Sequence, residues 1–304
     1  MEGLVYRSTG SWYEVKDLNN TFWKCRLKGK FKLDETIRSS NPIAVGDIVH
    51  FDIEDKTEES GMIYEIQNRT NYIARISPQN RNLKHIIASN LDQSLLVATL
   101  KNPKTSSGFI DRFLVSCEAY HIPAIIAFNK SDIYGEEEME RYDFLKNLYE
   151  NIGYQVALIS AEKNTAIDAL HELLANKKTL ISGHSGVGKS SLINVLMPEK
   201  NLKVKEVSDW SGKGMHTTTF AEMFDLNENS QIIDTPGIRE LGIVDVEKEE
   251  LSGYFPEMRE RLQYCKFNNC MHLNEPQCAI QAAVIDGEIE EERFSNYMGI
   301  LGSY

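Results

Sequence analysis

The feature that most constrains this chain is a glycine-rich stretch at residues 183–190, which reads Gly-His-Ser-Gly-Val-Gly-Lys-Ser. It matches the phosphate-loop pattern G-x-x-x-x-G-K-[ST] at every fixed position. The apolar run at 178–182 predicts a buried strand, and 191–196 carries apolar residues at helical spacing. A chance match would lack this setting of strand, loop and helix. The stretch therefore predicts an α/β domain that binds nucleotide phosphates.

The residue types of this loop suit an anion. Glycines permit backbone angles that other residues avoid, so successive N–H groups can point inward at a phosphate. Lys189 would reach the β- and γ-phosphates and act in catalysis, and Ser190 would place its hydroxyl on Mg²⁺. The alternative is a tight glycine turn without a ligand. The nucleotide-binding residues expected here are Gly183, His184, Ser185, Gly186, Val187, Gly188, Lys189, Ser190 and Ser191.

From residue 93 onward, runs typical of strands alternate with runs typical of helices. We expect strands and helices in turn at 95–100, 109–120, 124–128, 136–151, 155–159 and 165–175. This alternation predicts a mainly parallel sheet, and ligands bind such sheets at the carboxyl ends of the strands.

Two polar motifs follow expected strands of this sheet, Asn-Lys-Ser-Asp at 129–132 and Ser-Ala at 160–161, and both resemble guanine-reading elements of GTPases. A carboxylate at Asp132 can accept both N–H groups on the Watson–Crick edge of guanine, whereas adenine offers no matching pair of donors. Lys130 would cover the base, Asn129 would tie its loop to the phosphate loop, and a backbone N–H near Ala161 would meet the guanine carbonyl. Alone, the tetrapeptide is equally compatible with a polar loop. The assigned residues are Asn129, Lys130, Ser131, Asp132, Ser160 and Ala161.

Residues 212–219 have the composition of a nucleotide-sensing switch, because their glycines and small polar residues leave little to pack. One of Thr217, Thr218 or Thr219 could coordinate Mg²⁺ and sense the γ-phosphate, and we assign Thr218.

A second switch is expected at 232–237, where Ile-Ile-Asp-Thr-Pro-Gly ends a buried strand with an Asp-x-x-Gly turn. Asp234 would hold Mg²⁺ through water, and the Gly237 amide would meet the γ-phosphate. A strand-terminating turn is the alternative for the tetrapeptide alone. The next residue is Ile238, which cannot hydrogen-bond to an attacking water, so intrinsic hydrolysis should be slow.

Residues 1–70 show short alternating runs separated by turn signals, the rhythm of a small all-β barrel. In the run at 21–32, basic side chains recur at every second residue, so on an extended strand they share one face, with Phe22 and Trp23 at its start. This face would bind RNA through phosphate contacts and stacking. The alternative is a solvated edge strand protected by lysines, with nearby acidic residues offsetting the charge. The stripe consists of Lys24, Arg26, Lys28, Lys30 and Lys32.

Three of the five cysteines gather near the C-terminus as Cys265-x4-Cys270-x-His272-x5-Cys278. Four ligands so close together indicate a closed tetrahedral site for one structural zinc ion. A buried cysteine group with an incidental histidine is the alternative. Cys25 and Cys117 stand alone and are expected to serve packing.

Composition limits the remaining possibilities. The net charge of −12 argues against indiscriminate binding of nucleic acid, although one domain can still carry a basic face. The chain shows no apolar run long enough for a membrane span and no signal peptide, so we expect a cytoplasmic protein and no membrane partner.

The order of the motifs is unusual, because the guanine-reading elements precede the phosphate loop and Asp234 follows it. This order predicts a circularly permuted GTPase domain. Together with the N-terminal barrel and the cysteine cluster, it resembles the family of small-ribosomal-subunit-dependent GTPases called RsgA or YjeQ, over essentially the whole chain. The resemblance implies GTP hydrolysis with Mg²⁺ in response to the small subunit, late in its assembly. It also implies zinc at the four clustered residues and makes His216 a candidate to position the attacking water.

We therefore expect a multidomain fold: a barrel of the oligonucleotide-binding (OB) type that faces ribosomal RNA, a permuted α/β GTPase domain and a mostly helical zinc domain with helices near 246–263 and 287–298. Because the zinc domain follows the second switch, movement of 234–240 could be passed to it. A monomer is expected. The alternatives are an RNA scaffold that binds guanine nucleotides with negligible turnover, and a phosphotransferase. The domain limits are 1–70, a connector at 71–92, 93–242 and 243–304.

Overall fold

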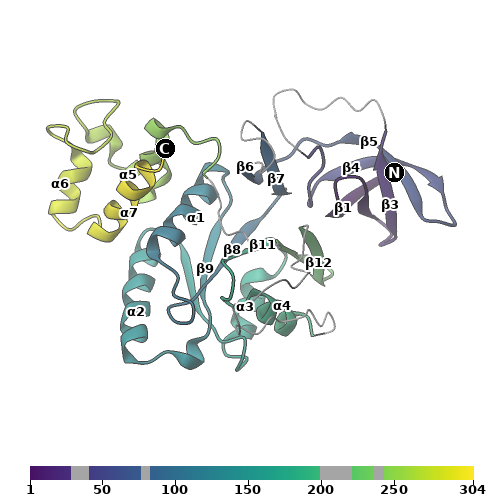
Figure 1. The fold of residues 1–304 in the computed structure, drawn as a ribbon, viewed down its shortest axis with the longest axis horizontal. Helices are drawn as coiled ribbons and strands as arrows, with labels where there is room; N and C mark the ends of the chain where they lie inside the picture. The colour runs from purple at the N-terminus through teal and green to yellow at the C-terminus, as the bar shows by residue number, and fades with distance from the viewer. Residues whose placement is uncertain (29–40, 77–82, 199–220, 236–242) are drawn as a thin grey trace, which may run out of the picture.

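The computed structural model of the chain describes residues 1–28, 41–76, 83–198, 221–235 and 243–304. The central sheet with its helices lies between the barrel, at the upper right of Figure 1, and the helical C-terminal unit, at the upper left. Within the described ranges, no helix is long and apolar enough to cross a membrane.

The N-terminal strands close into a barrel. They pair in the order β1-β2-β3-β5-β4, and β4 returns to β1. Side chains alternate between core and surface, so on β3 Trp23 and Cys25 are buried whereas Phe22, Lys24 and Arg26 are exposed. The predicted OB-type barrel is confirmed. Its strands are β1 (Glu2–Ser8), β2 (Tyr13–Asp17), β3 (Phe22–Leu27), β4 (Ile48–Asp55) and β5 (Ser60–Ile66).

The segment after the barrel is an antiparallel hairpin, β6 (Tyr72–Ile76) and β7 (Lys84–Ser89), and not only the polar connector expected at 71–92. The charged residues of this stretch concealed its short apolar runs, which are buried at Ile73, Ala74 and 86–88. Arg69 is also engaged, because its guanidinium donates to the buried Asp47 carboxylate at 2.6 and 2.7 Å. Val45 pairs with Ala88, so the hairpin joins the barrel to the central core.

The central sheet has the strand order β10-β9-β8-β11-β13-β12. All neighbours are parallel except the β13–β12 pair. At the far edge β12 also pairs with β1 of the barrel through Arg7 and Glu222, so one sheet continues across both domains. The sequence analysis did not anticipate β12. The strands are β8 (Gln93–Ala98), β9 (Ala124–Phe128), β10 (Gln155–Leu158), β11 (Lys178–Ser182), β12 (Glu222–Asn227) and β13 (Ser230–Asp234).

Helices cover both faces of this sheet (Figure 1). Residues alternate along β8, so that Leu96 and Ala98 face the core formed with α1 and α2, and Leu95 and Val97 face the core formed with α3 and α4. The carboxyl ends of the parallel strands are therefore left open for a ligand. The helices are α1 (Ser107–Ala119), α2 (Glu136–Asn151), α3 (Ile167–Leu174) and α4 (Lys189–Leu196).

The C-terminal unit is built from short helices, and the single helix expected near 246–263 is wrong. In its place lie η2 (Lys248–Tyr254), α5 (Pro256–Arg259) and η3 (Leu262–Tyr264). Pro256 explains the break, because proline lacks an N–H and starts a new helix at its first position. Two further helices follow, α6 (Ala279–Ile285) and α7 (Glu291–Leu301), the latter close to the helix expected near 287–298.

A buried charge network fastens this unit to the GTPase domain. The Arg293 guanidinium on α7 donates to Asp111 on α1 and to both carboxylate oxygens of Glu257 on α5, at 2.7 and 3.1 Å for the latter. Asn296 and Tyr149 complete the partners of Asp111 at 2.6 and 2.9 Å. Each charge is thus paired and hydrogen-bonded in the interior, as burial requires.

Candidate functional site

The phosphate loop lies between the carboxyl end of β11 and the first turn of α4. Gly183, Gly186 and Gly188 have φ angles of 143°, 84° and 94°, which favour glycine. A Cβ at Gly183 would lie 2.4 Å from the Val97 carbonyl oxygen, and one at Gly188 would lie 2.4 Å from Nδ2 of Asn129. Glycine is needed here both for the backbone angles and for the close approach of strand β8 and of the loop that carries Asn129.

Lys189 and Asp234 form the charged end of this site, at the start of α4 and the end of β13. The Lys189 ammonium donates to the carbonyl oxygens of Gly183 and His184, the latter at 3.0 Å. Burial lowers the pKa of Lys189, and the Asp234 carboxylate opposes that effect. Burial raises the pKa of Asp234 to about 6, partly offset by Lys189. An ammonium and a carboxylate side by side at this end of the site suit phosphates accompanied by a cation.

Asn129 joins three loops at the carboxyl edge of the sheet. Its Nδ2 donates to the Val187 carbonyl of the phosphate loop at 2.9 Å, and its Oδ1 accepts from the Ala161 amide at 3.0 Å. The structure therefore brings the Asn-Lys-Ser-Asp and Ser-Ala motifs together beside the phosphate loop. The Ala161 amide is engaged by Asn129, so a guanine carbonyl would need another N–H near it or a shared one.

The base-reading carboxylate is already oriented. Asp132 lies in a short 3-10 turn, η1 (Ser131–Ile133), and accepts a hydrogen bond from the Ser160 hydroxyl. Ser160 Oγ also accepts from the Lys163 amide at 3.1 Å. Lys130 precedes the turn in the left-handed conformation, with φ of 66°. The Ser160 hydroxyl thus fixes the orientation of the carboxylate that would accept from the Watson–Crick edge of guanine.

A fourth loop, residues 99–106 between β8 and α1, also lies at this edge, and sequence reasoning missed it. It has no nucleotide-binding motif, and its only signal is its place after a central strand. The Tyr134 hydroxyl donates to the Asn129 carbonyl at 2.6 Å and accepts from the Leu100 amide at 2.9 Å. Thr105 Oγ1 lies 2.8 Å from Nε2 of His184 in the phosphate loop. We call residues 99–106 the β8–α1 loop.

Several assigned residues lie outside the described ranges: the first switch with His216 and Thr218, the turn residues Gly237 and Ile238, and Lys30 and Lys32 of the basic stripe. Their assignments remain predictions.

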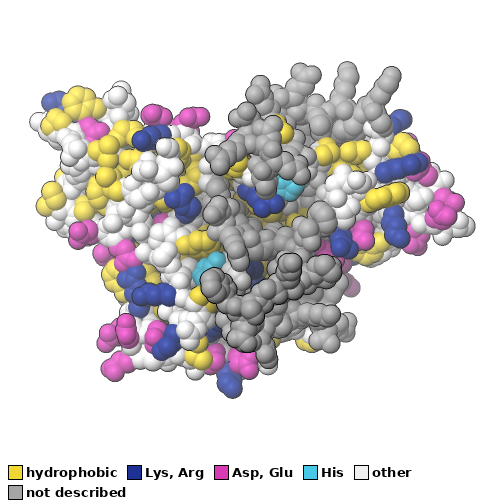
Figure 2. Space-filling view, in the orientation of Figure 1, with side chains coloured by type: hydrophobic (Ala, Val, Ile, Leu, Met, Phe, Trp, Pro, Cys, Tyr) yellow, Lys and Arg dark blue, Asp and Glu magenta, His cyan; other side chains and the backbone are white. Residues whose placement is uncertain are grey.

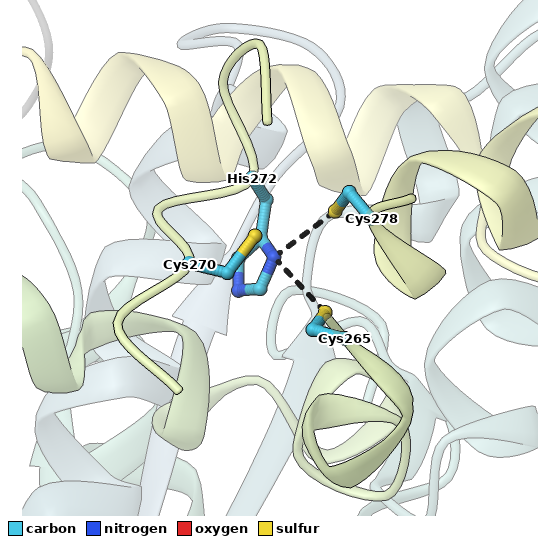
Figure 3. A group of neighbouring side chains, drawn as sticks. All are labelled: Cys265, Cys270, His272 and Cys278. Atoms are coloured by element: carbon cyan, nitrogen blue, oxygen red, sulfur yellow. Dashed lines mark hydrogen bonds between the residues drawn. The ribbon is translucent and has the colours of Figure 1, made fainter. Parts of the chain in front are cut away.

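The four clustered residues near the C-terminus converge on one point (Figure 3). One ligand atom from each of Cys265, Cys270, His272 and Cys278 lies within 4.8 Å of the others, so the group can hold a metal ion. Nδ1 of His272 points inward, 3.3 Å from the sulfur of Cys278 and 3.7 Å from that of Cys265. The distances suit a tetrahedral thiolate and imidazole site.

The chemistry of the cluster also fits a cation. Burial raises the pKa of Cys270 to about 12 and raises that of Cys278, so their thiolates would be unfavourable there without a positive charge. A coordinated metal supplies that charge and removes the thiol protons. Three thiolates and one imidazole leave no open position, which is typical of a structural zinc site and not of a catalytic one.

The basic stripe of the barrel is interrupted by acidic partners. Lys24 and Arg26 share the exposed face of β3, but the Arg26 guanidinium donates to both carboxylate oxygens of Glu54 at 3.0 and 3.2 Å. Trp23 is buried, and its Nε1–H donates to Asp17 at 3.0 Å, so its expected place beside an RNA base is wrong. Phe22 is 44% exposed and remains open to stacking. On the face seen in Figure 2, basic side chains of the barrel alternate with hydrophobic and acidic ones.

Two family models match successive parts of the chain. A family model described as the RsgA N-terminal domain matches residues 2–63, and one described as RsgA GTPase matches residues 66–244.

Relatives match along nearly the whole length. Proteins named "Small ribosomal subunit biogenesis GTPase RsgA" from Cytophaga hutchinsonii and Christiangramia forsetii are 52% and 50% identical over 302 residues, covering 99% of this chain and 98% and 96% of theirs. Among solved structures, YjeQ from Thermotoga maritima has a TM-score of 0.79 at 32% identity, covering 99% of this chain and 97% of its own. YloQ, described as a circularly permuted GTPase, has a TM-score of 0.75 at 31% identity, covering 99% and 94%.

Proposed function

The chain belongs to the RsgA family of GTPases, and from that premise we propose how its parts carry out the family's reaction. It is a GTP-hydrolysing enzyme of small ribosomal subunit biogenesis. We propose further that it binds the subunit late in maturation and that the nucleotide state controls its association and release. The useful output would be a conformational change, and GTP hydrolysis would determine when it occurs.

The observation that carries this proposal is the meeting of the guanine-reading and phosphate-binding loops at one edge of the sheet. Asn129 bonds to both the Val187 carbonyl and the Ala161 amide. Asp132 is held by Ser160. The phosphate loop supplies backbone N–H groups at the N-terminus of α4, where the helix dipole favours an anion. Both ends of a guanine nucleotide would thus be recognised.

The charged residues support phosphoryl transfer to water. Lys189 would neutralise the β- and γ-phosphates as negative charge redistributes in the transition state. Ser190, Asp234 and, in the first switch, Thr218 would hold Mg²⁺, which neutralises and orients the phosphates when bound. His216 would orient the attacking water, because Ile238 cannot.

The first experiment is GTP hydrolysis by the purified chain alone, with small subunits and with large subunits. Stimulation by the small subunit only is the expected result. Equal rates in all three reactions, together with tight GTP binding, would favour an RNA scaffold without turnover. His216→Ala should lose most of the stimulated rate, and full retention would remove His216 from the mechanism.

We propose that the C-terminal domain, residues 243–304, holds one structural zinc ion through Cys265, Cys270, His272 and Cys278. Its helices are too short to be stable without the site or their packing on α1.

Metal removal provides the test. Cys265→Ser should lose the bound zinc measured by elemental analysis and speed hydrogen exchange in α6. Cys117→Ser, a buried cysteine outside the cluster, is the matched control and should keep one zinc per chain. Full zinc content in Cys265→Ser would contradict the assignment.

We also propose that the barrel contacts ribosomal RNA through Lys24, Arg26 and Lys28, joined by Lys30 and Lys32. Each phosphate contact releases counterions, so binding of the small subunit should weaken steeply with salt. Lys24→Gln should reduce the slope by about one. The protein would act as a monomer in the cytoplasm.

A further inference from the structure

The strand order places the carboxyl end of β8 beneath the middle of a bound nucleotide. The phosphate loop follows β11 and the guanine-reading loops follow β9 and β10, and β8 lies between β9 and β11. A nucleotide that reaches from one set of loops to the other must cross the carboxyl end of β8. The β8–α1 loop occupies that end and contacts both sides.

Toward the guanine side, Tyr134 links two backbones. Its hydroxyl donates to the Asn129 carbonyl and accepts from the Leu100 amide. Burial raises the pKa of Tyr134 to about 12, so the hydroxyl keeps the proton that it donates. The ammonium of Lys130 also donates to the Asn102 carbonyl at 2.5 Å. Asn129 and Lys130, the first two residues of the guanine-reading motif, are therefore held by the β8–α1 loop.

Toward the phosphate side, Thr105 holds His184. Nδ1 of His184 lies 3.1 Å from the Ser185 carbonyl, which can only accept, so Nδ1 carries a proton. Burial lowers the pKa of His184, which leaves Nε2 unprotonated to accept from the Thr105 hydroxyl. In a trans peptide the carbonyl and the next N–H point in opposite directions. Because His184 holds the Ser185 carbonyl, the Gly186 N–H points in the direction opposite to that carbonyl. Asn129 orients the Gly188 N–H in the same manner, because it holds the Val187 carbonyl.

The β8–α1 loop is closed by hydrogen bonds between its two ends. The Thr105 amide donates to the Thr99 carbonyl at 2.7 Å, and the Thr99 amide donates to Thr105 Oγ1 at 3.0 Å. Thr99 and Thr105 are 0% and 3% exposed. Buried hydrogen bonds of this kind resist separation, because an unpaired group would remain away from water.

We propose that the β8–α1 loop sets the spacing between the phosphate loop and the guanine-reading loop, with Thr105 and Tyr134 as positioning residues for the guanine nucleotide. Neither side chain need touch the ligand. This inference rests on the proposed function in one respect, that the site binds guanine nucleotides.

The test measures the affinities of the full-length, folded protein for GDP and for IDP, which lacks the 2-amino group that would donate a hydrogen bond to Asp132. Thr105→Val loses the hydroxyl that donates to His184 and accepts from the Thr99 amide, so it should weaken both at least about tenfold and leave their ratio unchanged. Tyr134→Phe should weaken GDP about tenfold and lower the preference for GDP over IDP, because it frees the backbone that carries Asp132. In the double variant the losses should be less than multiplicative, since both act through one loop.

Two comparisons separate positioning from general destabilisation. Thr105→Ser keeps the hydroxyl and should bind both nucleotides nearly as the parent does. Tyr154→Phe loses the bond from its hydroxyl to Glu118 at 3.1 Å, away from the nucleotide site, and should leave both affinities unchanged.

Binding of GDP by Thr105→Val and Tyr134→Phe at the parent's affinity would overturn the proposal. Equal weakening by Thr105→Ser and Thr105→Val, or an unchanged GDP to IDP ratio in Tyr134→Phe, would also overturn it. If the parent itself binds no guanine nucleotide, the proposed function fails instead, so the two failures are distinct.

Discussion

The GTPase domain is joined to its two neighbours by junctions of different kinds. Toward the C-terminal domain, Arg293 and Asp111 are 1% and 0% exposed and lie in a fully paired network. Toward the barrel, Asp225 on β12 accepts from Tyr6 at 2.5 Å and from Lys16 at 2.7 Å, and its side chain remains 35% exposed. Buried charges separate only at a large cost in free energy, whereas hydrated charges separate at a small one. The buried ion pairs of the first junction are therefore harder to separate than the hydrated pair at Asp225 in the second.

The positions of the two junctions add to this difference. The C-terminal domain packs on α1, which follows β8 in the middle of the sheet, whereas the barrel meets β12, the strand beside β13 and Asp234. The sequence alone suggested that movement of 234–240 is passed to the zinc domain, which follows it. The packing favours the barrel as the part that responds to nucleotide.

The largest expected effect comes from breaking the first junction. Arg293→Met leaves Asp111 and Glu257 buried without their cation, and should lower the free energy of unfolding by about 3–5 kcal/mol. Urea denaturation measures the loss, and hydrogen exchange in α7 locates it. Arg112→Met, on the same helix as Asp111, loses a half-buried guanidinium that donates to the Ser303 hydroxyl and is not part of the charge network; it should cost less than about 1 kcal/mol. Similar values for the two variants would show that the network is not what fixes this domain.

An intermediate effect is expected at the barrel junction. Asp225→Asn weakens two charge-assisted hydrogen bonds and should cost about 1–2 kcal/mol. Hydrogen exchange should speed up in β1 and β12 and stay unchanged in α7. Asp52→Asn, an exposed carboxylate on β4, is the control and should change neither. Faster exchange in α7 would mean that the two junctions are coupled and do not respond separately.

The smallest expected effect is the loss of stability in acid that comes from the Arg141–Glu292 ion pair. The Arg141 guanidinium holds the pKa of Glu292 below its ordinary 4.5 at the C-terminal junction. A lowered folded-state pKa stabilises above pH 4.5, and that contribution is lost as the pH falls through the folded value. Because both side chains are about a third exposed, Glu292→Gln should cost less than about 1 kcal/mol at pH 7. The difference in unfolding free energy between Glu292→Gln and the parent should vanish in acid. A difference that grows there would show that folding does not lower the pKa of Glu292.

Sequence reasoning worked where local pattern decides structure. The strands at 124–128 and 178–182 and the helix at 136–151 lie where they were predicted, because apolar periodicity and the phosphate loop define them directly. It failed at the hairpin at 72–89, where short apolar runs lie among charges and long-range packing decides. It also failed at 246–263, where Pro256, a local helix breaker, divides the stretch that was expected to form one helix.

In the candidate site, too, the sequence predicts the residues that belong to local motifs and not those that act through distant contacts. The motifs identify the groups that would touch the nucleotide, such as Asp132 and Lys189. They are silent on Tyr134 and Thr105, whose partners Leu100 and His184 lie 34 and 79 residues away in the chain. No local pattern marks such a contact.

The pairing of β1 with β12 also has a consequence for how the chain avoids aggregation. The outer edge of β12 would be an open row of backbone donors and acceptors, and such edges recruit strands from other molecules. The barrel covers part of it through Arg7 and Glu222. A fragment without the barrel would leave this edge bare, so the N-terminal domain protects the GTPase domain from its own copies, independently of anything that it binds.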